Sequence, residues 1–136
     1  MLRLLLILCL TFCRAQAQPV AQVSSQKLLN VKVLPHGFSF KQTTVGGLSG
    51  IDYDATSKQY YLISDVRSSL QPARFYTAQI KITETGIDTV LITGVTTLHQ
   101  SNGKPYPGAK EDPAHTPDPE AIRYNPTKHQ LIWSSE

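Results

Sequence analysis

The architecture of this chain depends on one segment, Ser49-Gly-Ile-Asp-Tyr-Asp-Ala-Thr-Ser-Lys-Gln-Tyr-Tyr-Leu-Ile-Ser-Asp65. It holds two apolar and aromatic runs, separates them by a five-residue turn at residues 54–58, and ends in an acid. Alternating and β-branched runs favour strands, whereas Asp, Thr and Ser favour the turn between them. The segment therefore predicts a β-hairpin.

The same pattern recurs 71 residues later, from position 49 to position 120, as Glu120-Ala-Ile-Arg-Tyr-Asn-Pro-Thr-Lys-His-Gln-Leu-Ile-Trp-Ser-Ser-Glu136. Ile51 aligns with Ile122 and Tyr53 with Tyr124, and both copies end in an acid. A recurring strand-turn-strand-acid unit indicates an architecture repeated around an axis, and for antiparallel four-stranded units this is a β-propeller with blades of about 40 to 50 residues. The alternative is a chance likeness of two amphipathic hairpins.

Other alternating segments extend this pattern along the chain, and no segment shows a helical stripe. They are residues 31–34, 74–82, 89–93 and 95–98. The sequence thus predicts an all-β fold of antiparallel four-stranded blades. About two blades are present, whereas closed propellers need about four to eight, so the propeller is incomplete. We therefore expect the chain to be the N-terminal fragment of a longer protein.

The first residues have the layout of a secretory signal peptide. Arg3 precedes an apolar run at residues 4–12, and Ala15-Gln-Ala17 follows as a small-residue cleavage site. The sequence predicts a signal peptide over 1–17, a flexible N-terminus over 18–30, and the N-terminal part of the propeller domain over 31–136. The protein is expected to be secreted or periplasmic. Both cysteines, Cys9 and Cys13, lie in this leader. A lipoprotein signal ending in Cys13 is the alternative, but Phe12 stands where a small residue is expected.

Composition narrows the classes of partner. The formal net charge is +3, and two of the 13 basic residues, Arg3 and Arg14, lie in the leader. So weak a charge argues against nucleic acid as a partner. No apolar run approaches the length of about 20 residues that a membrane-spanning helix needs, so no membrane span is expected.

A proline-rich loop separates the two hairpins. Five of the nine prolines fall between Pro105 and Pro119, within a loop expected over residues 99–119. Loops longer than about 12 to 15 residues are uncommon in compact domains and are often functional. Its prolines are expected to order it, on one rim of the propeller.

Several motifs in order resemble the bacterial phytase-like family with esterase-like activity. They are Gly46-Gly-Leu-Ser-Gly-Ile-Asp-Tyr-Asp54, Tyr61-Leu-Ile-Ser-Asp-Val-Arg67, Ala73-Arg-Phe-Tyr76, and Asp118-Pro-Glu-Ala-Ile-Arg-Tyr124 with Trp133-Ser-Ser-Glu136. The resemblance covers about residues 34–136. It implies a secreted β-propeller that hydrolyses a small phosphorylated or ester substrate, in which acids around the central channel hold calcium.

Charged residues at the ends of the strands are the candidate site. Carboxylates are the hard oxygen ligands of calcium, and arginine binds phosphate in a bidentate manner. The predicted catalytic residues are Glu120, Glu136 and Arg74, the predicted substrate-binding residues are Arg67 and Arg123, and the predicted metal ligands are Asp65, Asp118, Glu120 and Glu136. For each acid the alternative is a solvated strand-end or turn residue.

Two functions therefore follow from the sequence. The first is a secreted, calcium-assisted phosphoester or ester hydrolase of phytase-like type. The second is a non-catalytic propeller that binds a carbohydrate, a peptide or an envelope partner through its rim loops. A truncated chain without independent function is a third possibility.

Overall fold

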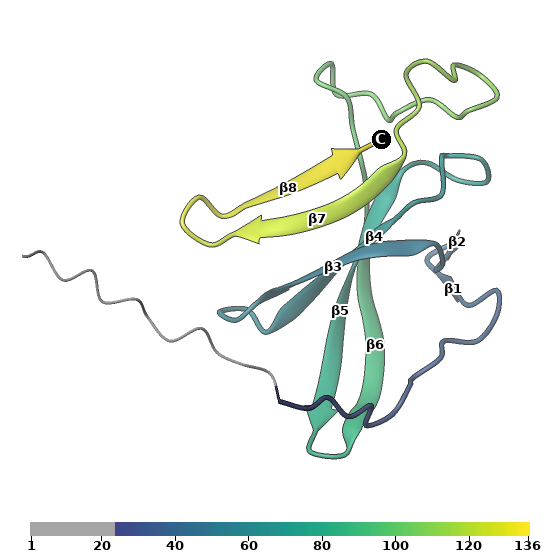
Figure 1. The fold of residues 1–136 in the computed structure, drawn as a ribbon. Coiled ribbons are helices and arrows are strands. Elements are labelled where there is room, and N and C mark those ends of the chain that lie inside the picture. Colours follow the sequence, from purple (N-terminus) through teal and green to yellow (C-terminus); the bar gives the residue numbers. More distant parts are fainter. Residues whose placement is uncertain (1–23) are drawn as a thin grey trace, which may run out of the picture.

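The computed structural model describes residues 24–136, and these residues form an all-β structure without a helix (Figure 1). The predicted signal peptide over 1–17 lies outside the described residues. The strands are β1 (Ser39–Phe40), β2 (Thr43–Thr44), β3 (Leu48–Asp54), β4 (Gln59–Ser64), β5 (Arg74–Thr83), β6 (Gly86–Thr97), β7 (Pro119–Asn125) and β8 (Gln130–Ser135). The all-β prediction is confirmed.

The strands form three antiparallel sheets, β1-β2, β3-β4-β5-β6 and β7-β8. The second sheet is a meander of four strands in chain order, with the long β5–β6 hairpin extending away from β7–β8 (Figure 1). None of the sheets closes on itself within the part of the chain that the structure describes. No described helix is long and apolar enough to cross a membrane.

The strand predicted at residues 31–34 is wrong. These residues have no regular secondary structure, and Val31 and Val33 are largely exposed. Alternation predicts which residues share a side of a strand, but a strand also needs a partner, and here none of the described strands pairs with the segment. Just before it, Asn30 is held by β6, because its side chain accepts from Ile87 N at 2.8 Å and donates to Ile87 O at 3.0 Å.

The 71-residue repeat is a repeat of structure. In the first hairpin the register passes from Leu48↔Ser64 to Gly50↔Ile63, so Ser49 forms a bulge. In the second it passes from Pro119↔Ser135 to Ala121↔Ser134, so Glu120 forms the equivalent bulge. Both turns use the same side-chain bond, from Thr56 N to Asp54 Oδ1 at 2.9 Å and from Thr127 N to Asn125 Oδ1 at 3.0 Å. A chance likeness of two hairpins would not reproduce both the bulge and the turn.

The turn of the first hairpin makes the stability of the protein depend on pH. Asp54 is buried and accepts hydrogen bonds from Ser57 Oγ at 2.6 Å and from Thr56 N. The Ser57 bond, followed by the backbone bonds, lowers the pKa of Asp54 below its ordinary value of 3.8. A lowered pKa stabilises the fold above the unfolded-state pKa, and this contribution is lost as the pH falls through the folded-state pKa.

We therefore expect Asp54→Asn, which copies the residue of the second hairpin, to remove part of the loss of stability between pH 5 and pH 3. Urea unfolding at these two pH values measures it. An equal loss in both proteins would show that Asp54 does not titrate with folding.

The second hairpin lies across the β3–β4 end of the meander, above it in Figure 1. Ile63 and Ile122 share one buried cluster, and the rings of Tyr61 and Tyr124 stack with centroids 5.5 Å apart. At Gly50 the backbones come so close that a Cβ atom would lie 3.0 Å from Ala121 Cα. Glycine fits this close approach, because a side chain at this position would have to displace the backbone of β7.

Polar bonds tie the same two hairpins together. Ser49 Oγ donates to Pro119 O at 3.0 Å, Tyr124 N donates to Asp52 Oδ2 at 2.7 Å, and Arg123 Nη1 donates to Ile51 O at 3.0 Å. The opposite side of the meander is covered by the N-terminal segment, where a second cluster contains Val45, Leu62, Tyr76, Ala78 and Ile92. The central strands β4 and β5 are thus packed on both sides.

The proline-rich loop is ordered by contacts with β8 and with itself. Tyr106 packs edge-on against Trp133 with ring centroids 5.8 Å apart. Thr116 is buried, and its hydroxyl donates to Asp112 O at 2.8 Å. Pro119 is fully buried and is the first residue of β7. The packing of Pro119 therefore fixes the end of the loop. The loop therefore positions the start of β7.

Candidate metal centre

Three acids come together where β7 begins and β8 ends. Carboxylate oxygens of Asp118, Glu120 and Glu136 lie within 4.8 Å of one another. Asp118 is partly buried, whereas Glu120 and Glu136 are exposed. The group is open to solvent on one side, as a site for a small ligand must be.

Backbone geometry holds these acids in place. Glu136 N donates to Asp118 O at 3.1 Å, and Asp118 N donates to Ser135 Oγ at 2.8 Å. Glu120 occupies the bulge between the pairs Pro119↔Ser135 and Ala121↔Ser134. Because a bulge adds one residue to a strand, it changes the direction of a side chain, and bulges are common beside active sites.

The repeat explains why this group belongs to the second hairpin alone. The equivalent positions in the first hairpin are Gly47, Ser49 and Asp65, which supply one acid. A side chain at Gly47 would collide with the Asp65 carboxylate, and Gly47 has a φ of +56° that favours glycine. Asp65, a predicted metal ligand, thus lies in the first hairpin and outside the group of three acids.

Arg67 lies beside the acidic group. Its Nε is 3.3 Å from Asp118 Oδ2, and its side chain is 58% exposed, against 18% for Asp118. An exposed ion pair of this kind contributes about 1 kcal/mol or less. The guanidinium therefore remains available to an anion that reaches the acids.

The other two predicted arginines lie elsewhere. Arg74 is 2% exposed, and its guanidinium donates to Tyr76 Oη at 2.6 Å, to Thr44 O at 2.8 Å and to Pro72 O at 3.1 Å. Its donors are thus used in packing the N-terminal segment onto the meander. Arg123 is exposed, bonds to Ile51 O and lies 3.8 Å from Asp52. Neither arginine bonds to the three acids within the described residues.

A hollow of about 310 Å³ adjoins the acidic group. Glu136 forms part of its wall, together with Gln100, Tyr106, His115, Trp133 and Ser135. The sequence did not single out Tyr106, Trp133 or Ser135 for this site, because only the packing of the proline-rich loop against β8 brings them together. The sequence offers one signal for them: Tyr106 stands between two prolines of the loop, and Trp133 and Ser135 come shortly before Glu136.

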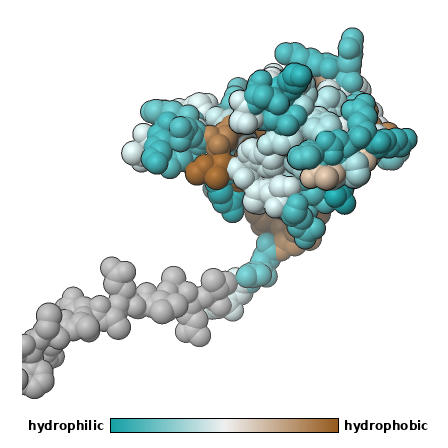
Figure 2. Space-filling view, turned by 90° about the horizontal axis from the view of Figure 1, so that it is seen from above, coloured by the Kyte–Doolittle hydropathy of each residue, from teal (hydrophilic) through white to brown (hydrophobic). Residues whose placement is uncertain are grey.

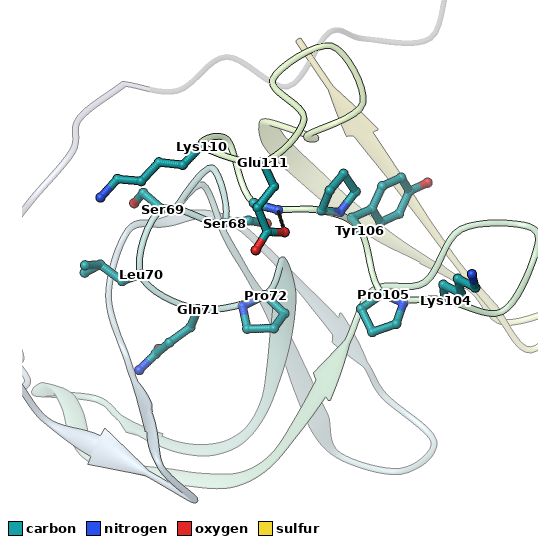
Figure 3. A pocket seen from close by; sticks show the side chains of 12 residues that line it. Ser68, Ser69, Leu70, Gln71, Pro72, Lys104, Pro105, Tyr106, Lys110 and Glu111 are labelled. Carbon is teal, nitrogen blue, oxygen red and sulfur yellow. Dashed lines mark hydrogen bonds between the residues drawn. The ribbon is translucent and has the colours of Figure 1, made fainter.

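A larger hollow, of about 660 Å³, lies between the loop after β4 and the proline-rich loop (Figure 3). Its walls combine prolines with hydroxyl and charged side chains, and Glu111 points toward its centre in Figure 3. Gly108 N donates to Glu111 Oε2 at 3.5 Å. This hollow shares Tyr106 with the one beside the three acids and differs from it in its other wall residues.

The residues present fit calcium. Calcium takes six to eight oxygen ligands at about 2.3 to 2.6 Å, so two ligand oxygens on one ion lie at most about 5 Å apart. The 4.8 Å spread of the three carboxylates meets this limit. Each carboxylate can bind through one or both oxygens, and the exposed side leaves room for water or substrate.

Comparison with known proteins identifies a family. A family model described as "Phytase-like: Esterase-like activity of phytase" matches residues 43–136, which is more than half of the chain. The match begins at β2 and includes both hairpins, the proline-rich loop and all three acids. Searches of curated proteins and of solved structures found no match.

Proposed function

Because the chain belongs to the phytase-like family, we propose that it forms part of a secreted or periplasmic, calcium-assisted hydrolase of phosphoesters or esters. The family indicates a phytase-like or esterase-like hydrolase fold that acts on a small molecule. To this family assignment the proposal adds the cellular compartment, the calcium ion and the residues of the site.

We also propose that the fold is the beginning of a β-propeller. The meander β3–β6 has the strand number and the antiparallel order of a propeller blade. The hairpin β7–β8 repeats the first half of that meander, including its bulge, and packs across it. This supports β7–β8 as the first half of a second blade.

The single observation that carries the function is the group formed by Asp118, Glu120 and Glu136 with Arg67 beside it. Three carboxylates repel a phosphate or the oxyanion that forms during ester hydrolysis, so the group suits such a substrate only when a cation is held between them. A bound calcium ion would supply positive charge and polarise the substrate oxygen.

The chain's own residues supply the remaining functions. Asp118, Glu120 and Glu136 would hold the cation, and a carboxylate oxygen left free on Glu120 or Glu136 would accept a hydrogen bond from the attacking water and orient it. Arg67 binds phosphate oxygens through its planar fork. Tyr106 and Trp133, in the wall of the adjoining hollow, exclude water from one side of the substrate.

Turnover of a phosphate monoester and of an aryl ester tests this function. We expect calcium-dependent hydrolysis by the protein, and a loss of at least about 100-fold in Glu120→Gln combined with Glu136→Gln. Asp65→Asn is the matched control, because it removes an exposed acid outside the group and should leave turnover unchanged. Equal turnover with and without calcium would contradict the proposal.

A second candidate function rests on the larger hollow of Figure 3. Its volume of about 660 Å³, its prolines and its hydroxyl groups suit a carbohydrate or a peptide bound at the rim without catalysis. The variants Glu120→Gln and Glu136→Gln separate the two functions. A hydrolase loses turnover, whereas a rim binder keeps its affinity.

A further inference from the structure

Asp118 belongs both to an ion pair and to the acidic group. Its Oδ2 lies 3.3 Å from Arg67 Nε, and its carboxylate is also one of the three whose oxygens lie within 4.8 Å of one another. Among residues 24–136, Arg67 is the one basic residue that forms an ion pair with any of these acids. A cation that binds between the acids therefore meets the Arg67 guanidinium at Asp118.

The two partners of this ion pair differ in how firmly they are held. Asp118 N donates to Ser135 Oγ at 2.8 Å, and Asp118 O accepts from Glu136 N at 3.1 Å. The Arg67 side chain is exposed, and within the described residues its guanidinium has no polar partner other than Asp118. If the pair breaks, it is therefore the guanidinium that moves.

The backbone around Arg67 keeps this side chain beside the acids. Ser68 N donates to Val66 O and so closes a three-residue turn centred on Arg67. Ser68 Oγ accepts from Ala73 N at 3.0 Å. A Cβ atom at Gly108 of the proline-rich loop would lie 3.1 Å from Ser68 O, so the two loops are in close contact. A guanidinium that leaves Asp118 thus stays within the length of its own side chain of the acidic group.

The surroundings of the ion pair favour an exchange of partners. Figure 1 places the C-terminus and the two loops at one end of the molecule, and Figure 2, the view onto that end from above, shows a mostly hydrophilic surface. An exposed ion pair contributes little to stability, so little is lost when Arg67 exchanges one anionic partner for another. Its five N–H donors match the oxygens of a phosphate as well as those of a carboxylate.

We propose that Arg67 passes from Asp118 to the substrate when calcium binds. The proposal rests on the calcium site of the proposed function and adds how that site is regulated. With calcium between the three acids, Asp118 binds the ion, and the like charge repels the guanidinium from the same carboxylate. Arg67 then binds an anionic group of the substrate beside the ion. Calcium and the anion therefore strengthen each other's binding by the same factor.

Arg67→Gln should change two affinities in opposite directions. Calcium should bind about three- to fivefold more tightly, because the competing guanidinium is absent. An anion should bind at least about tenfold more weakly in the presence of calcium, because its charge-assisted hydrogen bonds to Arg67 are lost. An arginine that only stabilised the loop would weaken both affinities or neither.

Arg67→Lys is the second variant, because it keeps the charge and loses the planar fork. Calcium should bind within about twofold of its affinity for the original protein, since a cation still competes for Asp118. The anion should bind at least about threefold more weakly, because an ammonium group cannot bind it in a bidentate manner.

Isothermal titration calorimetry measures these affinities with two probes, calcium chloride and phenylphosphonate, a phosphate analogue that is not hydrolysed. Calcium is titrated into each protein, and phenylphosphonate into each protein at saturating calcium. Lys81→Gln is the matched control, because it also removes one charge from an exposed ion pair, that with Asp88 at 2.9 Å on the β5–β6 hairpin. It should leave both affinities within about twofold of the original. Circular dichroism checks that each variant is folded.

Nuclear magnetic resonance follows the exchange itself. The Arg67 Nε–H signal is identified by its loss in Arg67→Gln, and in the original protein it should shift on addition of calcium and again on addition of phenylphosphonate. Calcium affinity that is unchanged or reduced in Arg67→Gln, or an Nε–H signal that calcium does not move, would overturn the exchange and leave the calcium site standing. Failure of calcium to bind to any of these proteins would instead contradict the proposed function, and the exchange with it.

Discussion

Gly50→Val is expected to lower the free energy of unfolding by about 3 kcal/mol, near the upper end for overpacking a well-packed site. At Gly50 a Cβ atom would lie 3.0 Å from Ala121 Cα, 3.0 Å from Ile122 N and 3.1 Å from Ile63 Cγ2. Two of these atoms belong to the backbone of β7, so a rotamer change cannot relieve the contact. Valine therefore separates the two hairpins and exposes the cluster around Ile122.

Gly46→Val provides the matched control, because nothing lies within 4 Å of a Cβ atom built at Gly46. Urea unfolding monitored by circular dichroism measures both variants. We expect Gly46→Val to stay within about 0.5 kcal/mol of the original protein. Equal stability of the two variants would show that the second hairpin does not pack on the first as described.

Arg74→Leu is expected to cost about 3 kcal/mol of stability while leaving calcium binding unchanged. The buried guanidinium donates to Tyr76 Oη, Thr44 O and Pro72 O, so its removal loses three charge-assisted hydrogen bonds at once, although Tyr76 Oη still donates to Thr44 O. Arg74→Lys keeps the charge but not the three-way geometry, and should lose about half as much.

Urea unfolding and calcium titration of the same variants separate a structural role of Arg74 from a catalytic one. A structural arginine changes the unfolding midpoint and leaves the calcium affinity intact. Loss of turnover in Arg74→Lys without loss of stability would instead support Arg74 as the catalytic residue that the sequence predicted.

The sequence predicted the hairpins well because both their turns and their alternation are local properties. The turn residues Asp54 and Asn125 bind the backbone two residues later, and the strands on either side follow from apolar and aromatic runs. The repeat aligned Ile51 with Ile122, and the structure gives these residues equivalent partners, Leu62 for Ile51 and Trp133 for Ile122.

Other features depended on packing that no local pattern encodes. Residues 31–34 alternate in the manner of a strand but lack a partner strand among the described residues. The short β1–β2 hairpin has no apolar periodicity from which it could be predicted. Arg74 stands at the start of a strand, where a surface residue is equally compatible with the sequence. Its side chain is nevertheless buried and donates a hydrogen bond to Thr44 O.

The acidic group was predicted in part. Glu120 and Glu136 were identified as the ends of the repeated hairpin, and Asp118 as part of the family motif. Asp65 shares the position of Glu136 in the repeat, but its neighbours Gly47 and Ser49 are not acids, so the first hairpin cannot assemble a second group of three. Two residues at equivalent positions of the repeat thus share a backbone position, but they need not share a role in metal binding.

Calorimetric titration of calcium into the protein tests the central claim most directly. We expect one calcium ion to bind with a dissociation constant between about 10 µM and 1 mM, in the range of an open site with few carboxylates. Glu136→Gln should weaken binding at least about tenfold, whereas Asp65→Asn should bind as the original protein does. Binding that survives Glu136→Gln, or that is lost in Asp65→Asn, would contradict a calcium site formed by Asp118, Glu120 and Glu136.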